Sequence, residues 1–275
     1  MLRVVSLNLN GIRAAWRKGL AAWLAAEKPD VVCMQELKAQ AADLTDEMTA
    51  PAPLRGYFSF AARPGYSGVG IYTRHRPQAV THRFGDAGVD GEGRFIRVDF
   101  PACSVVSLYM PSGSSGEVRQ EFKYRLMKKF RRRFAAYQRE TAESGRQFIL
   151  CGDWNIAHTQ QDIRNWRGNQ KNSGFLPEER EWFGALLAAG WVDVFRHLND
   201  SDGEYTWWSN RGNAWANNVG WRIDYQLATT GIAGKATRAA IYRAERFSDH
   251  APLTIDYRAS RASRASGAKG AKAKG

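Results

Sequence analysis

The chain has 275 residues, of which 44% are hydrophobic, and its formal net charge at pH 7 is +13. This length can bury a large core in one or two domains, and we expect one. No apolar stretch approaches the roughly 20 residues needed to cross a bilayer, and no signal peptide is evident, so we expect a soluble, cytoplasmic protein. Its three cysteines lack metal-ligand spacing, which disfavours a zinc site or a disulfide framework.

The placement of the positive charge divides the chain into two parts. Residues 258–275 contain six basic residues, no acidic residue and nothing that could pack a core. We therefore expect one folded domain over residues 1–257 and a disordered basic tail over 258–275. Without the six charges of the tail, the net charge of +13 falls to +7 on residues 1–257. A basic body suits a polyanion, although a solvated basic surface without a dedicated partner is the alternative.

Short apolar, β-branched runs predict strands at residues 3–7, 31–34, 69–72, 95–100, 103–108, 148–150, 223–227 and 253–257. Apolar residues at helical spacing predict helices around residues 16–24 and 122–137, and Pro177 with the acids after it marks another helix start. Several consecutive strands have no helix between them. This favours an α/β fold of two packed mixed sheets flanked by helices over a regular βα repeat.

Polar side chains stand where several of these predicted strands begin or end. They are Asn8, Glu36, Tyr109, the pair Asp153 and Asn155, and the pair Asp249 and His250. Apolar or turn residues could have closed a core at all of these places. The pattern therefore indicates one shared site for a hard cation and a phosphate.

Glu36 and Asp153 are the leading candidates for catalytic carboxylates. Mg²⁺ is commonly held by one or two protein carboxylates together with water and phosphate oxygens. Either acid alone would more often be an ordinary loop or capping residue. His250 could contact a phosphoryl oxygen while Asp224 orients its ring, and a turn with a hydrogen-bonded histidine is the alternative.

Aromatic residues flank the polar segment 210–220. Trp207, Trp208 and Trp221 lie on either side of this expected surface loop, where they could present aromatic faces to a nucleic acid. Placement in the core is the alternative. The segment 156–176 is rich in Asn, Gln, Gly and Arg, and its length suggests that it lies over a functional face.

Together these residues resemble the exonuclease III family of DNA-repair enzymes, within the endonuclease/exonuclease/phosphatase superfamily. The likeness covers residues 1 to about 257. It rests on ordered motifs at residues 6–14 (SLNLNGIRA), 34–38 (MQELK), 65–70 (GYSGVG), 92–94 (EGR), 109–111 (YMP), 152–158 (GDWNIAH), 172–175 (NSGF), 221–225 (WRIDY) and 248–250 (SDH).

The resemblance implies a four-layered α/β sandwich and hydrolysis of phosphodiesters that depends on Mg²⁺ or Mn²⁺. It implies cleavage of duplex DNA on the 5′ side of abasic sites, together with 3′–5′ exonuclease and 3′-phosphatase activity on ordinary or blocked 3′ ends. The proportions of these activities are left open. We expect a monomer without a membrane partner.

The resemblance also carries roles to individual positions. Asp153 would activate or position the attacking water, oriented by Asn155, while Tyr109 and His250 would lie beside the phosphate, with Asp224 holding His250. Glu36 would be the principal metal carboxylate. The other members of the implied metal set are Asn8, Asp153, Asn155, Asp249 and His250. The implied contacts with DNA are Arg13, Tyr66, Arg94, Ser112, Asn169, Lys171 and Asn172, and the walls of the abasic pocket are Trp207, Trp221 and Ile223.

Two positions depart from the family pattern. Many members have Asn where this chain has Ser112, and some have Asp where it has Asn10, so metal affinity and the balance of activities are open. Two other functions compete: a phosphoesterase of the same superfamily acting on a lipid or small phosphoester, and a noncatalytic DNA-binding module. The basic body favours duplex DNA over lipid, and the intact candidate residues argue against the module.

Overall fold

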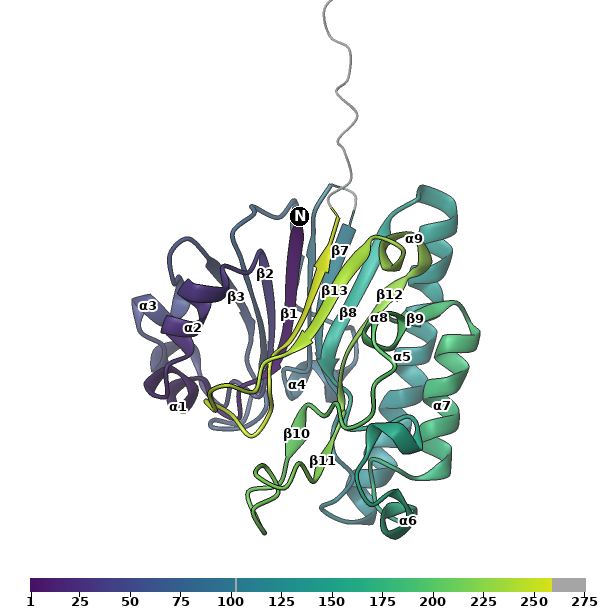
Figure 1. Ribbon diagram of the computed structural model, residues 1–275. Coiled ribbons are helices and arrows are strands. Elements are labelled where there is room, and N and C mark those ends of the chain that lie inside the picture. The colour runs from purple at the N-terminus through teal and green to yellow at the C-terminus, as the bar shows by residue number, and fades with distance from the viewer. Residues whose placement is uncertain (102, 259–275) are drawn as a thin grey trace, which may run out of the picture.

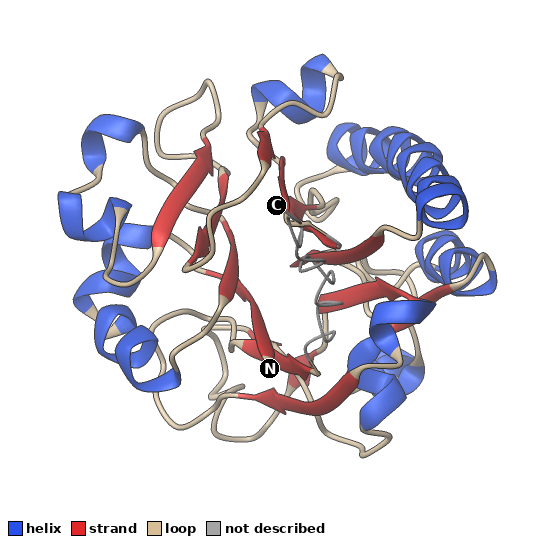
Figure 2. Ribbon diagram, turned by 90° about the horizontal axis from the view of Figure 1, so that it is seen from above, coloured by secondary structure: helices blue, strands red, loops and turns tan. Residues whose placement is uncertain are grey.

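Two six-stranded mixed sheets pack face to face, and helices cover both outer faces, which gives four layers (Figure 2). This architecture confirms the expected four-layered α/β sandwich. The computed structural model describes residues 1–101 and 103–258. Apart from Arg258, the predicted basic tail lies outside the described residues. No helix among those residues is long and apolar enough to cross a bilayer.

The first sheet has the strand order β13 (Ala236–Ile241), β14 (Leu253–Tyr257), β1 (Leu2–Asn8), β2 (Val31–Gln35), β4 (Val69–Thr73) and β3 (Arg55–Ser59). The second has the order β5 (Ala79–Thr81), β6 (Phe95–Asp99), β7 (Cys103–Tyr109), β8 (Gln147–Asp153), β12 (Asp224–Thr229) and β9 (Trp191–Asp193). The pairs β1–β2 and β7–β8 are parallel, and the other pairs are antiparallel.

Strand direction explains why polar residues gather at one end of the sandwich. Because β1 and β2 are parallel, Asn8 and Gln35 lie side by side at their carboxyl ends. In the second sheet the parallel pair β7 and β8 places Tyr109 beside Asp153. β12 runs the other way, so its first residue, Asp224, also lies opposite Asp153. The polar strand ends therefore face a common edge.

Helices cover the outer faces of the sheets (Figure 1). The first sheet is covered by α1 (Ile12–Arg17), α2 (Leu20–Glu27) and α3 (Asp46–Thr49), and the second by α5 (Glu117–Ser144) and α7 (Pro177–Ala188). The helix expected around residues 16–24 is divided into α1 and α2 by Gly19, whose φ of 103° lies in the left-handed region. The short helices are α4 (Ala87–Gly91), α6 (Trp166–Asn169), α8 (Val194–Leu198) and α9 (Thr230–Ala233).

A two-stranded ribbon of β10 (Trp207–Trp208) and β11 (Gly220–Trp221) lies below the polar end of the sandwich (Figure 1). Apolar side chains fill the spaces between the layers. Val4 packs between the sheets, whereas its neighbour Val5 packs toward α2, as strand alternation requires. Phe134 of α5 packs against Trp154, just beyond β8. Each layer is thus anchored to the strands that carry the polar ends.

One buried polar contact joins the two sheets directly behind that end. Gln35 Nε2 donates a hydrogen bond to Ser107 Oγ (2.9 Å), and Ser107 Oγ donates to the main-chain oxygen of Met34 (2.9 Å). Gln35 and Ser107 are both fully buried. The contact fixes the β2 end, and so the start of the turn at Glu36, against β7.

Ser107→Ala should therefore lower the free energy of unfolding by about 1–3 kcal/mol, because the buried Gln35 amide would lose its acceptor. Urea unfolding followed by circular dichroism measures this change. The double variant Gln35→Leu with Ser107→Ala removes both partners and should recover part of the loss. A double variant no more stable than Ser107→Ala would contradict the proposed role of this bond.

Candidate active site

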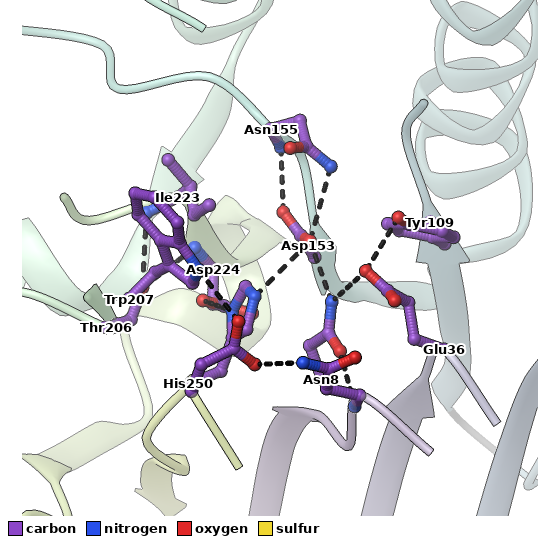
Figure 3. A network of polar contacts seen from close by, with 12 residues as sticks. Asn8, Glu36, Tyr109, Asp153, Asn155, Thr206, Trp207, Ile223, Asp224 and His250 are labelled. Carbon is purple, nitrogen blue, oxygen red and sulfur yellow. Dashed lines mark hydrogen bonds and ion pairs between the residues drawn. The ribbon is translucent and has the colours of Figure 1, made fainter. Parts of the chain in front are cut away.

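One buried amide joins carboxylates that belong to different sheets. Asn8 ends β1, Glu36 follows β2, and Asp153 ends β8. Asn8 Nδ2 donates to Glu36 Oε1 (3.0 Å) and to Asp153 Oδ2 (2.9 Å) (Figure 3). The structure thus brings three of the predicted site residues into contact across the sandwich.

Left-handed backbone aims the side chains that follow the strands. Glu36 and Asn155 each have a φ of 50°, a conformation that L-residues other than glycine adopt uncommonly. The turn folds Asn155 back onto Asp153, because its main-chain nitrogen donates to Asp153 Oδ1 (2.8 Å). The Nδ2 of Asn155 donates to Asp153 Oδ2 (3.3 Å) and to the main-chain oxygen of Met110 (2.9 Å). Asp153 is consequently fixed in one orientation.

Glu36 is held as an anion. Its Oε2 lies 2.6 Å from Lys38 Nζ, and its Oε1 accepts a hydrogen bond from the Tyr109 hydroxyl (2.7 Å). Burial would raise the pKa of Glu36, but Lys38, Asn8 and Tyr109 outweigh burial and lower it. Burial, with the negative charge of Glu36, holds the pKa of Tyr109 well above its usual value. Tyr109 is therefore a neutral donor at physiological pH.

Oxygen atoms beside Glu36 converge on a positive charge. Lys38 Nζ also donates to Asn10 Oδ1 (2.5 Å), and Asn10 Nδ2 donates to Asp249 Oδ1 (2.9 Å). Carboxylate and amide oxygens around a cation are the ligand chemistry of Mg²⁺. In the part of the chain that the structure describes, no three His, Cys, Asp or Glu side chains are placed to hold a metal by themselves. A metal held by Glu36 would complete its coordination with water or phosphate oxygens, as Mg²⁺ commonly does.

His250 is paired with two aspartates. Its Nδ1 lies 2.8 Å from Asp224 Oδ2, and its Nε2 lies 3.9 Å from Asp153 Oδ2 (Figure 3). Burial of the ring opposes a positive charge, but Asp224, with Asp153 and Asp249, outweighs burial and raises the pKa of His250 to about 10. A protonated ring at this place can donate a hydrogen bond to a phosphate oxygen, and the expected place of His250 among the metal ligands stays a prediction.

Asp153 has a different protonation behaviour from Glu36. Burial is the main cause that raises its pKa, the charges of Asp224 and Glu36 add to it, and His250 opposes them, so that the pKa is about 7. A carboxylate with this pKa can accept a proton near neutral pH. The two acids are thus prepared for different roles by their surroundings.

A cleft of about 740 Å³ opens over these residues. Glu36, Tyr109, Asn155, Asp153, Asp249 and His250 line its inner part. Trp207, Trp221 and Ile223 line it on one side, and Ser112, Lys171 and Asn172 also line it. A second hollow of about 770 Å³ lies between residues 160–168 and 202–205, and none of the candidate catalytic residues lines it. The candidate catalytic residues that line a hollow therefore meet at the first of the two.

The consecutive tryptophans divide between the cleft and the core. Trp207 pairs with Trp221 across the β10–β11 ribbon, their rings 6.1 Å apart at 85°, and Trp207 Nε1 donates to Asp249 Oδ2 (3.2 Å). Trp208 points the other way and packs against Trp215 with ring centroids 4.4 Å apart. Strand alternation sends the two side chains to opposite faces. Trp207 and Trp221 therefore line the cleft, whereas Trp208 does not.

Arg94 does not lie where the resemblance placed it. Its side chain is 1% exposed, too buried to contact DNA directly. Its Nη1 donates to the main-chain oxygen of Tyr109 (3.0 Å), its guanidinium carbon lies 4.4 Å from the Tyr109 ring centroid, and its Nε donates to Glu92 Oε2 (2.6 Å). The structure corrects the expectation, because Arg94 supports Tyr109 from behind.

The other expected DNA contacts differ in exposure. Lys171 and Asn172 are exposed, and Asn172 donates to Asn169 Oδ1 (2.8 Å). Arg13 is exposed, and Tyr66 donates to Glu92 Oε2 (3.2 Å). Arg13, Tyr66 and Asn169 do not line the cleft. They can act only where a long ligand extends beyond it.

Sequence reasoning assigned no role to three residues that support the site. Lys38 contacts Glu36 as described, and the Glu92 carboxylate holds Arg94. Thr206 Oγ1 accepts from the main-chain nitrogens of Ile223 and Asp224, both at 3.1 Å. Lys38 lies two residues after Glu36 and Glu92 two residues before Arg94, and these spacings were the available signals. Thr206 reaches Ile223 and Asp224 only through folding.

Comparison with known proteins agrees with the motifs. Residues 5–250 match the Endonuclease/Exonuclease/phosphatase family, and the chain belongs to that family. It is 35% identical to "DNA repair nuclease APEX1" of Danio rerio, an alignment that covers 92% of this chain and 81% of the relative. It is 34% identical to an exodeoxyribonuclease of Bacillus subtilis, covering 92% of this chain and 98% of the relative. The solved structure of an AP endonuclease from Archaeoglobus fulgidus superposes with a TM-score of 0.82 at 26% identity, covering 94% and 99% of the two chains.

Asp224→Asn should lower the pKa of His250 from about 10 toward its ordinary value, because the strongest attraction for the imidazolium is lost. A raised pKa stabilises the folded protein below the unfolded value near 6.5, and that contribution is lost as pH rises toward 10. In Asp224→Asn this stabilising contribution should be lost completely at a lower pH than in the wild-type protein. NMR titration of the His250 ring measures the change, with Asp46→Asn at the start of α3 as the control. The same titration in wild type and Asp224→Asn would contradict the pairing.

Proposed function

We propose that this chain is a divalent-metal-dependent DNA-repair phosphodiesterase. It would cleave duplex DNA on the 5′ side of abasic sites and process 3′ ends as an exonuclease and phosphatase. The observation that carries the proposal is the joining of Glu36 and Asp153 by Asn8, beside the His250 imidazolium, inside a cleft with an aromatic wall. Relatives described as a DNA repair nuclease and an exodeoxyribonuclease support it.

In this mechanism Asp153 accepts the proton of the attacking water, which its pKa of about 7 permits near neutral pH. Asn155 keeps the Asp153 carboxylate in one orientation. His250 donates to a non-bridging phosphate oxygen and offsets the negative charge that develops in the transition state. Tyr109, which stays protonated, donates a hydrogen bond beside the same phosphate.

Glu36 is the residue proposed to hold Mg²⁺ or Mn²⁺, with Asn8, Asn10 and Asp249 nearby. The metal would neutralise charge on the phosphate and the departing oxygen. Lys38 Nζ contacts the same oxygen atoms of Glu36 and Asn10 that lie beside the proposed metal position. When a metal binds, the Lys38 ammonium must therefore move aside or remain as a neighbouring positive charge.

Duplex DNA is the proposed partner, and a monomer remains the prediction for the assembly. Lys171, which is exposed at the cleft, and Arg13, which is exposed beyond it, suit contacts with the phosphates of a duplex. Residues 258–275 are proposed as a basic tail that adds affinity without sequence specificity. Among the described residues, the only exposed large apolar side chains are Met1 and Val118, so a lipid substrate would find no apolar docking surface there.

The proposed division of labour predicts opposite behaviour of two isosteric variants. Activity on a labelled duplex with one abasic analogue should vanish with chelator and return with Mg²⁺. Glu36→Gln weakens a metal ligand, so raised Mg²⁺ should restore part of its turnover. Asp153→Asn removes the proton acceptor, so it should lose at least about 10²-fold in kcat without rescue.

Duplex binding by Asp153→Asn, measured in chelator, should stay close to wild type and serves as the control for folding. Full activity in excess chelator would refute the metal, and near-normal turnover of Asp153→Asn would refute its role. Undamaged and 3′-phosphate duplexes in the same assay report the balance of activities.

The aromatic wall predicts selectivity for sugars without a base. Turning a nucleotide out of the helix costs a few kcal/mol and is easiest where no base must be unstacked. Trp207→Ala and Trp221→Ala should therefore lower abasic cleavage more than removal of 3′ nucleotides, with little change in thermal stability. Trp16→Ala, on α1, is the control. An unchanged ratio of the two activities in folded variants would assign both tryptophans to the core alone.

A further inference from the structure

A single buried carboxylate behind the cleft collects donors from several segments. Glu179, on α7, is fully buried. Its Oε2 accepts from the main-chain nitrogens of Gly174 (2.6 Å) and Leu176 (3.2 Å). Its Oε1 lies within hydrogen-bonding distance of Lys123 Nζ (2.5 Å), Gln120 Nε2 (3.0 Å) and Ser173 Oγ (3.3 Å). Glu179 therefore ties α5, α7 and the loop before α7 together.

Lys123 extends this cluster to the candidate catalytic residues. It lies on α5, is also fully buried, and donates from Nζ to the main-chain oxygen of Asn155 (2.8 Å). Asn155 in turn holds Asp153 through its main-chain nitrogen and its side chain. A continuous chain of polar contacts thus runs from Glu179 through Lys123 and Asn155 to Asp153.

The Glu179 carboxylate also holds the end of the loop that carries Lys171 and Asn172. Its bonds to residues 173, 174 and 176 fix the end of that loop. Ser173 Oγ accepts from the main-chain nitrogen of Gly113, next to Ser112 on another part of the cleft. Gly174 has a φ of 96°, and a Cβ there would lie 3.0 Å from the Trp221 ring and 3.1 Å from the Asn155 oxygen. The loop is therefore closely packed between the Trp221 ring and the turn at Asn155 that holds Asp153.

A contribution to stability alone does not explain why Lys123 and Glu179 are buried as an ion pair. Replacing a buried ion pair with apolar residues of similar volume is often neutral or stabilising, because both charges must be taken out of water. Here burial lowers the pKa of Lys123 and the Glu179 charge opposes that effect. Yet the contacts of the pair lead to three cleft-lining segments: Asn155, residues 112–114 and residues 171–174.

We propose that Lys123 and Glu179 form a positioning pair for the phosphodiesterase reaction. Lys123 sets the Asn155 turn, and so the orientation of Asp153, while Glu179 also fixes the loop that meets the substrate. Neither residue touches the substrate. The inference rests on the proposed function and names how the reacting groups of that site are held in place.

The test compares Lys123→Met, Glu179→Gln and the double variant. Each single variant leaves one buried group without its partner and should lower Tm by roughly 5–15 °C. The double variant leaves no unpaired charge and should lose less Tm than either single variant. Its kcat should nevertheless stay at least about tenfold below wild type, as should that of Lys123→Met, because a small displacement of a reacting group is costly.

Two substrates separate the effects of the two residues. Bis(p-nitrophenyl) phosphate lacks the flanking nucleotides that a duplex would offer to the 171–174 loop, whereas its reacting phosphodiester needs the same positioning of Asp153. Lys123→Met should therefore lose kcat on it as on abasic duplex. Glu179→Gln should raise KM for the duplex and not for the small diester, and the main-chain amides of Gly174 and Leu176 should exchange hydrogen faster. Arg97→Met breaks an ion pair with Asp99 (2.6 Å) and is the control, expected to lower Tm without changing kcat.

A kcat of folded Lys123→Met within twofold of wild type would overturn the proposal. So would a double variant that regains wild-type turnover together with its stability, because the pair would then serve the fold alone. If the wild-type chain hydrolyses neither substrate, the proposed function fails separately. The rate of main-chain hydrogen exchange at Gly174, Leu176 and Asn155 in the three variants still tests whether the pair holds these segments. Rates equal to those of the wild type would reject the positioning role of Lys123 and Glu179.

Discussion

The hydrogen bonds from the Asn8 amide to Glu36 and Asp153 are the constraint on which the site depends. Two carboxylates close together repel each other, and a hydrogen-bond donor between them lowers the cost of placing both at one buried edge. That donor reaches both acids because it ends β1 in the first sheet while Asp153 ends β8 in the second. The parallel registers of β1 with β2 and of β7 with β8 fix where these strand ends lie along the common edge of the sandwich. A slip of one residue in β8 would turn Asp153 to the opposite face of its sheet and dismantle the site.

Environment then separates the two acids. Glu36 lies beside the Lys38 ammonium, which keeps it ionised, whereas Asp153 is enclosed by protein and faces other acids, which raises its pKa to about 7. One carboxylate is thus suited to hold a cation and the other to take up a proton. His250 would be neutral near pH 7 in water, but its acidic neighbours keep it charged. The same crowding of carboxylates therefore produces both a base and a cationic donor.

The sequence predicted the parts of this arrangement that are local. Buried apolar runs identified the central strands, and polar residues at their ends identified the site residues that the structure now brings together. It missed β3, β5, β9, β10, β11 and β13, which are short or partly exposed and lack a continuous apolar run. It also placed Arg94 on the DNA, because an arginine in a motif does not reveal whether its side chain is covered. Nothing in the sequence distinguishes Lys123 from the other basic residues of α5, and only its packing against Glu179 does so. The different orientations of Trp207 and Trp208 follow from strand alternation, but a two-residue strand leaves no pattern to detect.

A site for phosphate must not repel phosphate, and the distribution of charge around the cleft meets that requirement. The acids Glu36, Asp224, Glu92 and Glu179 are paired respectively with Lys38, His250, Arg94 and Lys123. Of these cations, Arg94 and Lys123 are buried behind the cleft, where water screens them little. Lys123 is also attracted by Asp153, so it adds positive potential beneath the residue proposed to accept the proton. A buried pair that contributes little to stability can therefore serve the reaction in two ways, since its contacts fix geometry and its charge balances the acids. This accounts for charged groups at a depth where apolar side chains would have packed at lower cost.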